Sequence, residues 1–176
     1  MSGFGIIRMQ SFEVTVNGRK VVTEDYEQRF GVGTPELRVA LVGCCAQKAL
    51  VPCAARDMYR SPLFRAARAY AEATCQQWFI LSAKFGLVHP NELIHPYDQR
   101  LERENARWGE RVGQQIDDAL PFPAFANAEL VVLAGKDYAN AISFAGREFS
   151  WSEPLEGLGI GDRIRWLQQN TPKRSR

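Results

Sequence analysis

The chain lacks the features that mark several large classes of protein. None of its apolar runs approaches the length of about 18 residues that a membrane-spanning helix needs, and its first residues lack the apolar core of a secretory signal. A Walker loop, a G-x-S-x-G motif and a dinucleotide-binding glycine pattern are all missing. We therefore expect a cytoplasmic protein without membrane contact, outside the common kinase, hydrolase and dehydrogenase fingerprints.

The chain also lacks a large excess of positive or negative charge. The 22 Lys and Arg residues balance 20 Asp and Glu residues, which leaves a net charge of +2 over 176 residues. This balance disfavours a surface that coats nucleic acid, although it permits a local basic patch. The four cysteines, Cys44, Cys45, Cys53 and Cys75, lack the paired C-x-x-C spacing of a zinc site. We expect reduced thiols, no metal and no cofactor.

What the chain does have is an ordinary globular composition. Apolar residues make up 45% and charged residues 24%, so disorder and coiled coil are excluded as the main state. A chain of this size buries roughly 70% of the surface that it exposes when unfolded. The length therefore predicts one domain with a full apolar core.

The N-terminal region predicts an appendage to that domain. Residues 12–22 alternate like a β-hairpin around Asn17-Gly18, which suits a two-residue type I′ turn. The polar stretch that follows indicates a linker. We expect a hairpin extension and linker over residues 1–36, an α/β domain over 37–170 and a basic tail over 171–176.

Three short, continuous apolar runs predict the core strands of a mostly parallel sheet covered on both faces. They are Arg38–Gly43, Gln77–Ser82 and Glu129–Gly135. Helical patterns lie between and after these runs, so the predicted fold class is α/β with a mostly parallel sheet, flanking helices and the N-terminal hairpin.

Four helices are expected. Ser61-Pro62 opens the first, with Ser61 as N-cap. The second spans about Leu101 to Leu120, with an apolar stripe, and ends at the break that begins with Pro121. The other two are predicted over residues 137–145 and 161–169. The stripe consists of Trp108, Val112, Ile116 and Leu120.

Lysine is scarce and unevenly placed. The chain has five lysines, and Lys48, Lys84 and Lys136 lie within a few residues of the three strand ends. Because ligands of open α/β sheets bind outside the carboxyl ends of the strands, these lysines and nearby glycines favour a pocket for an anionic or carbonyl-rich group. Polar loops without a ligand are the alternative.

Candidate nucleophiles and bases are few. Cys44 follows a strand and is either a nucleophile beside Lys48 or a small buried side chain. His89 and His95 each precede a proline and are either bases or surface groups. Asp57 and Asp137 are further candidate bases that can instead cap a turn or helix.

Arginine supplies 17 of the 22 basic residues. One group, interleaved with aromatic residues around the first helix, is a candidate nucleic-acid surface, because guanidinium groups and aromatic rings suit phosphates and bases. This group consists of Arg56, Arg60, Arg65 and Arg68. The arginines of the second helix alternate with acidic residues, which favours a solvated, ion-paired face.

The segment from Phe79 to Tyr97 resembles the central signature of the YaaA family, the peroxide-stress-resistance proteins: an apolar strand, L-S-G-x-Y-G, L-x-P, a spacer and P-Y. Residues 45–48 resemble the S-P-A-K-like turn of that family, and residues 131–138 are similar to its strand with A-S-x-E-Y. A compact bacterial and phage relative of the family is closer still. Its motifs C-S-x-x-K, A-R-x-L-Y-x-S-x-x-F and L-S-A-K-x-G-L correspond here to residues 44–48, 55–64 and 81–87.

The resemblance has three departures, one of which is that His89 and His95 stand where the family has other residues. Cys45 stands where the family has a serine before the first lysine, and too few residues separate Gly43 from Gln77 to hold the helix–hairpin–helix insertion linked to DNA binding in long YaaA proteins. Related domains occur in enzymes that modify or exchange nucleobases. The resemblance therefore implies base chemistry on a nucleic acid or a nucleotide.

These observations lead to one main expectation, a nucleobase- or nucleotide-processing enzyme that acts at an N-glycosidic bond or on an exocyclic group. The alternative is a non-enzymatic, DNA-binding stress-response protein that uses the arginine group. A third reading is an interaction module that pairs through the hairpin edge. The predicted catalytic residues are Cys44, Lys48, Ser82 and Lys84, and the predicted substrate-binding residues are Cys45, Ser61, Phe85, Gly86, Tyr97, Gly135 and Tyr138.

Overall fold

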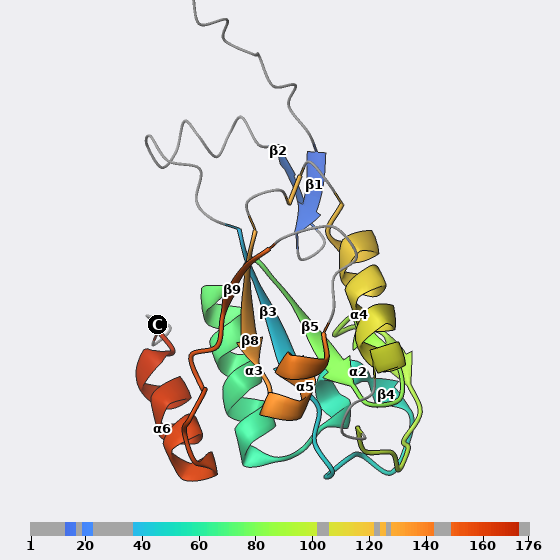
Figure 1. The fold of residues 1–176 in the computed structure, drawn as a ribbon, viewed down its shortest axis with the longest axis vertical. Helices are drawn as coiled ribbons and strands as arrows, with labels where there is room; N and C mark the ends of the chain where they lie inside the picture. Colours follow the sequence, from blue (N-terminus) through green and yellow to red (C-terminus); the bar gives the residue numbers. More distant parts are fainter. Residues whose placement is uncertain are drawn as a thin grey trace, which may run out of the picture. The chain divides into compact units, whose positions relative to one another are not determined.

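The structure is a computed structural model, and it describes residues 37–101, 106–121, 124–125, 128–142 and 149–172, together with the backbone of two N-terminal strands. Its internal contacts divide the chain into two compact units, Met1–Pro35 and Glu36–Arg176 (Figure 1). The second unit contains all the predicted site residues.

The first unit contains the predicted hairpin strands. Strand β1 (Glu13–Val16) pairs antiparallel with β2 (Arg19–Val22). The Asn17-Gly18 turn lies outside the described residues. The pairing agrees with the antiparallel arrangement that the alternating sequence predicted.

The second unit is built on a five-stranded sheet, in which the described strands have the order β6-β5-β3-β8-β9. The central strands are parallel: β3 (Arg38–Gly43), β5 (Gln77–Ser82) and β8 (Glu129–Leu133). The first two have the predicted bounds, and the third ends two residues earlier than predicted. The α/β class with a mostly parallel sheet is confirmed.

Two short edge strands complete this sheet. Strand β6 (Gly86–Val88) folds back antiparallel to β5, and β9 (Ser150–Ser152) runs parallel to β8. Because β3 lies in the middle and is covered on both faces, its residues Val39 to Val42 are all 0% exposed. Full burial explains why its sequence is continuously apolar rather than alternating.

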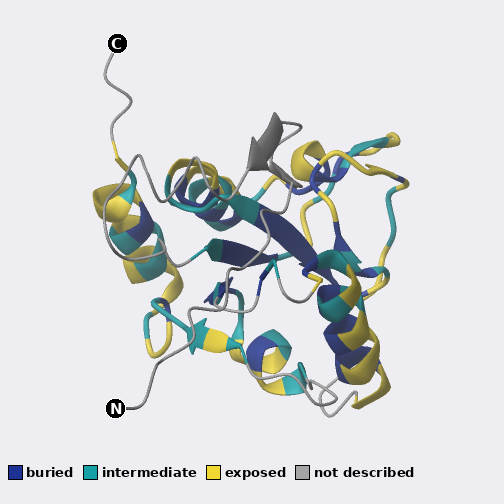
Figure 2. Ribbon diagram, turned by 90° about the horizontal axis from the view of Figure 1, so that it is seen from above, coloured by how far each residue is buried: buried dark blue, intermediate teal, exposed yellow. Residues whose placement is uncertain are grey.

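Helices cover both faces of the sheet (Figure 2). Helices α3 (Pro62–Thr74) and α6 (Ile160–Asn170) pack together on one face, and α4 (Ala106–Ala119) and α5 (Lys136–Ala141) lie on the other. The predicted α4 stripe is confirmed, since Trp108, Val112, Ile116 and Leu120 are buried. Part of its predicted start, residues 102–105, lies outside the described residues.

A small second sheet joins the loops beyond β3 and β6. Strand β4 (Cys53–Ala54) pairs antiparallel with β7 (Leu93–Ile94), and β4 leads directly into the short helix α2 (Ala55–Met58). The backbone N–H of Ala55 also donates to Glu92 O at 2.8 Å. This pairing was not predicted, and it links the segment after β3, which carries Cys44 and Lys48, to the segment after β6, which carries Tyr97.

Among the described helices, none has both the length and the apolar character needed to cross a membrane.

Candidate functional site

The carboxyl ends of β3, β5 and β8 meet at one edge of the sheet, as predicted. The register aligns Gly43 with Leu81 and Val42 with Leu133. The Cys44 N–H continues the ladder by donating to Leu81 O at 2.9 Å. The three segments that follow these strands, which carry predicted catalytic or substrate-binding residues, therefore leave the sheet side by side.

Gly43 allows the ends of β3 and β8 to approach closely. A Cβ atom at Gly43 would lie only 3.0 Å from Ala134 Cβ, which is tighter than ordinary packing. Ala134 and Gly135 lead into α5, which carries Tyr138. The Cys44 Sγ and Tyr138 Oη atoms are 3.1 Å apart in a hydrogen bond. The close approach thus joins residues from two strand ends.

Hydroxyl groups from the end of β5 and from two other segments form a chain beside this pair. Tyr97 Oη lies 2.8 Å from Ser82 Oγ and 2.9 Å from Tyr59 Oη. Ser82 is 0% exposed, and its Oγ also accepts from the Phe85 N–H at 3.1 Å. Its carbonyl oxygen accepts from Trp108 Nε1 at 3.0 Å. Ser82 is therefore held rigidly, with its polar atoms engaged.

Two of the predicted lysines flank the Tyr97 ring. Lys48 Nζ lies 4.3 Å from the ring centroid and Lys84 Nζ 5.9 Å from it, and Lys84 is also 5.2 Å from the centroid of Phe85. All three distances are within the range of a cation–π interaction. Neither lysine forms an ion pair in the described part of the chain, so both ammonium groups are available to an anion.

Burial changes the chemistry of the three tyrosines. It raises the pKa of Tyr59 to about 12 and raises the pKa values of Tyr97 and Tyr138 as well, with the negative charge of a Cys44 thiolate as a further cause. All three phenols are therefore neutral near pH 7. They can orient a ligand or donate hydrogen bonds, but they do not serve as ready bases.

We name this set the strand-end cluster. It contains Cys44, Lys48, Tyr59, Ser82, Lys84, Phe85, Tyr97 and Tyr138. Tyr59 was not among the predicted site residues, although it is one of the aromatic residues interleaved with the arginine group around the first helix. An isolated Lys48–Tyr59 bridge between backbones positions it, and local sequence carries no signal for such a bridge.

Three further predicted substrate-binding residues, Cys45, Ser61 and Gly135, have different local contacts. Cys45 Sγ donates to Gln47 O at 3.1 Å, and Ser61 Oγ caps α3 by accepting from the Phe64 N–H at 3.1 Å. Gly135 precedes α5, and a Cβ there would meet no atom within 4 Å. Open space therefore adjoins the backbone at Gly135.

Gly86 serves the packing of α4 on β6. Its φ is +78°, and a Cβ would lie 2.1 Å from Gln115 Oε1. That oxygen accepts from the Leu87 N–H at 2.9 Å. Positive φ and close packing both account for a glycine here, so the position is explained without a ligand.

The predicted nucleic-acid surface is partly neutralised. Arg68 pairs with Asp57 at 2.8 Å and with Glu72 at 2.8 Å, and Arg56 lies 3.7 Å from Asp57. Asp57, a candidate base, is thus an ion-pair partner. Arg60 and Arg65 are exposed and form no ion pair in the described chain. Two of the four predicted arginines therefore keep a free charge.

The other candidate bases do not join the strand-end cluster. His89 is exposed, and its Nδ1 accepts from the Asn91 N–H at 3.2 Å, while His95 and Asp137 are also exposed. Within the described residues, no group of three or more His, Cys, Asp or Glu side chains could hold a metal.

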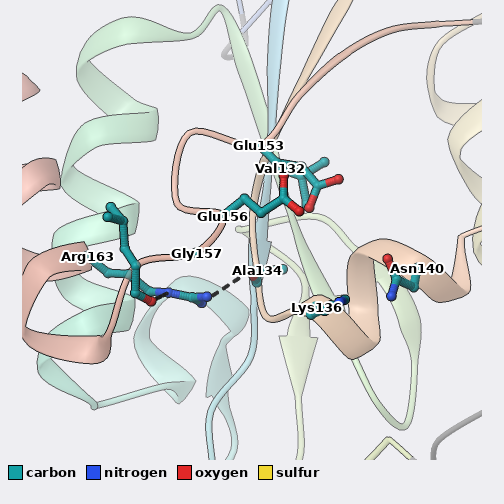
Figure 3. A pocket seen from close by; sticks show the side chains of 9 residues that line it. Val132, Ala134, Lys136, Asn140, Glu153, Glu156, Gly157 and Arg163 are labelled. Carbon is teal, nitrogen blue, oxygen red and sulfur yellow. Dashed lines mark hydrogen bonds between the residues drawn. The ribbon is translucent and has the colours of Figure 1, made fainter.

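A separate cavity of about 280 Å³ lies at the end of β8 (Figure 3). Lys136 is the one lining residue that was discussed above as part of a predicted pocket. The acidic residues come from the turn between β9 and α6, for which no structure was predicted. The cavity is lined by Val132, Ala134, Lys136, Asn140, Glu153, Glu156, Gly157, Leu158 and Arg163.

The fold and the site define an α/β domain with a lysine, tyrosine and thiol cluster at the carboxyl edge of its sheet. The chain belongs to a family of unknown function (DUF6884), whose sequence model matches residues 39–169. It is also similar to the uncharacterized protein YfjM of Bacillus subtilis (strain 168), with 29% identity over 133 residues, covering 67% of this chain and 80% of that protein. The family match spans every element of the strand-end cluster.

Proposed function

We propose that this protein is a nucleobase- or nucleotide-processing enzyme that acts at an N-glycosidic bond or on an exocyclic group of a base. The observation that carries the proposal is the strand-end cluster. There, two ammonium groups that form no ion pair within the described residues lie near the Tyr97 ring, whose hydroxyl group bonds Ser82 and Tyr59. Cationic, aromatic and hydroxyl groups are the partners that a phosphate-bearing, planar ligand requires.

Each group has a role in this proposal. Lys48 and Lys84 bind phosphate or stabilise the negative charge that develops on a departing base or oxyanion. Ser82 and Tyr97 orient the ligand through their hydroxyl groups. Cys44 is the candidate nucleophile, and the neutral Tyr138 hydroxyl at 3.1 Å can donate to its sulfur and stabilise a thiolate.

The proposal includes kinship with the YaaA family. The motif that carries the resemblance, Leu81 to Leu87, contains Ser82 and Lys84 of the strand-end cluster. A cytoplasmic location belongs to the same proposal. It is supported by four cysteines that are all unpaired thiols, as expected in a reducing compartment.

The test is an activity assay with a matched set of variants. Base release or base modification is measured on free nucleotides, single strands and duplexes, for the wild-type protein and for the K48A/K84A double variant. We expect the double variant to lose at least about a hundredfold in rate, because both transition-state cations are removed. Equal rates in the two proteins would overturn the assignment of the site.

Two controls make this assay specific. Arg165→Gln removes a positive charge whose side chain is 69% exposed on α6, and we expect it to retain full activity. Thermal unfolding of each variant must match that of the wild-type protein, so that a loss of rate reports on chemistry rather than on folding.

A non-enzymatic, nucleic-acid-binding function is the second candidate, favoured by the free charges of Arg60 and Arg65. It predicts binding that weakens steeply as the salt concentration rises, and that is lost in an R60Q/R65Q variant but retained in K48A/K84A. A flat salt response in a binding titration would remove this candidate.

A further inference from the structure

The cavity at the end of β8 differs from the strand-end cluster in its charge. Lys136 and Asn140 enter it from α5, Glu153 and Glu156 from the turn after β9, and Arg163 from α6. In Figure 3 the two glutamates converge near Val132, while Arg163 and Lys136 lie on opposite sides of Ala134. The cavity thus has an acidic part and a basic part.

Arg163 is held in place by backbone atoms rather than by an acid. Its Nε donates to Leu158 O at 2.8 Å and one terminal nitrogen to Ala134 O at 3.5 Å. No carboxylate pairs with Arg163 or with Lys136 among the described residues. Two cationic side chains therefore line the cavity without a counter-ion among the described residues, and the bonds to backbone oxygens orient that of Arg163.

The acidic part is also shaped by the backbone. Glu153 accepts from Trp151 Nε1 at 2.8 Å, which positions its carboxylate. Glu156 precedes Gly157, whose φ of +72° turns the chain from β9 toward α6. No cation pairs with Glu153 or Glu156 in the described chain. Two carboxylates at one end thus match the two cations at the other.

The charges indicate the kind of ligand. Two cationic and two anionic side chains sum to zero, so a doubly charged phosphate would find no excess of positive charge. A ligand with separated opposite charges satisfies both ends, because it places an anion at Arg163 and Lys136 and a cation at Glu153 and Glu156. The cavity of about 280 Å³ suits a small molecule.

The geometry points to a binding site for a free amino acid or a similar small zwitterion. Its carboxylate binds between Arg163 and Lys136, its ammonium group lies at Glu153 and Glu156, and Asn140 supplies a further hydrogen bond. This site is distinct from the strand-end cluster, and the inference does not rest on the proposed base chemistry.

The test is calorimetric titration of the purified full chain with each of the common amino acids. We expect at least one to bind, and its N-acetyl and amide derivatives, which each lack one charge, to bind at least about tenfold more weakly. Titrations with inorganic phosphate and ribose 5-phosphate test whether the protein instead binds phosphate-bearing ligands. Binding of these phosphates in preference to every amino acid would overturn the inference, as would binding of neither class.

The variants locate the binding. Glu156→Gln and Lys136→Gln change exposed side chains without a partner in the described chain, and each should weaken binding at least about tenfold. Arg165→Gln, on the same helix as Arg163, is the matched control and should leave affinity unchanged. Arg163 itself bonds two carbonyl oxygens that support its loop, so its substitution is not used as the deciding variant.

One further variant separates the two proposals. K48A/K84A should bind the amino acid as tightly as the wild-type protein, even though it is expected to lose base chemistry. Unchanged affinity in both Glu156→Gln and Lys136→Gln would place the ligand elsewhere and overturn this site.

Discussion

The strand-end cluster and the charged cavity share helix α5, yet they are built in opposite ways. Tyr138 belongs to the cluster, whereas Lys136 and Asn140 line the cavity, because residues two apart on a helix point to different sides. The hydroxyl groups of the cluster bond one another. The four charged groups of the cavity instead form no ion pairs with described residues. The first arrangement is preorganised from within, and the second needs a ligand to satisfy its charges.

The largest expected effect on stability follows from the internal bonding of the cluster. Ser82→Ala should lower the free energy of unfolding by about 1–3 kcal/mol, because it leaves the Phe85 N–H without its side-chain acceptor and removes one of the two partners of the Tyr97 hydroxyl. Urea denaturation measures this change. Tyr97→Phe removes two bonds of the same network and serves as the companion variant. Full stability in both would show that the cluster is not held by its hydroxyl groups.

The turn that carries Glu156 gives the next largest effect. Gly157→Ala should cost about 1 kcal/mol, because a side chain disfavours the φ of +72° even where no atom lies within 4 Å of a Cβ. The same variant should weaken amino-acid binding if the turn positions the acidic part of the cavity. Thermal unfolding and calorimetry report the two effects separately. If Gly157→Ala has both the stability and the affinity of the wild-type protein, the turn does not position the acidic part of the cavity.

Glu129, the first residue of β8, lies at the amino ends of the strands and allows a pH-dependent comparison with the strand-end cluster. Partial burial tends to raise the pKa of Glu129, but the bond from Ser152 Oγ at 2.6 Å and the Arg38 guanidinium at 2.8 Å outweigh it, so the pKa lies below its usual range. A lowered folded-state pKa stabilises the fold above the unfolded value of about 4.3, and the gain is lost as the pH falls through the folded value.

Glu129→Gln should therefore reduce stability by up to about 1 kcal/mol at pH 7 and by less at pH 3. Denaturation at both pH values measures the difference, with Glu156→Gln as a control that lacks such an ion pair. An equal loss at the two pH values would contradict the role of the Glu129 charge.

The smallest effect is expected in the cavity. Glu156→Gln should change the free energy of unfolding by no more than about 0.5 kcal/mol, since the carboxylate is exposed and has no partner in the described chain. Its effect should appear in ligand binding instead. A large loss of stability in urea would show that the cavity, like the cluster, is held together from within.

The sequence predicted the elements whose signals are local. The β3 and β5 runs are continuously apolar because both faces are covered, and their bounds are confirmed. Ser61 caps α3 as its position before Pro62 predicted. Trp108, Val112 and Ile116 repeat at helical spacing because one side of α4 packs on the sheet.

The elements that were missed are too short to carry a pattern. Strands β4 and β7 have two residues each, and β6 and β9 have three. Their pairing depends on which loops the larger sheet brings together, not on their own composition. Because the sequence pattern predicted neither β9 nor the turn after it, Glu153 and Glu156 were absent from the predicted site residues.

The sequence by itself determined the sheet strands, the helical faces and the placement of Lys48, Lys84 and Lys136 beside strand ends, because these depend on burial and on neighbours along the chain. Only the tertiary structure decided how those residues are grouped. It placed the Tyr59 hydroxyl within hydrogen-bond distance of the Tyr97 hydroxyl and paired Arg68 with Asp57 and Glu72. It also placed Lys136 in the lining of the cavity, apart from the other two lysines. Side-chain partners across distant loops follow from sheet register and close backbone approach, and both are properties of the packed chain.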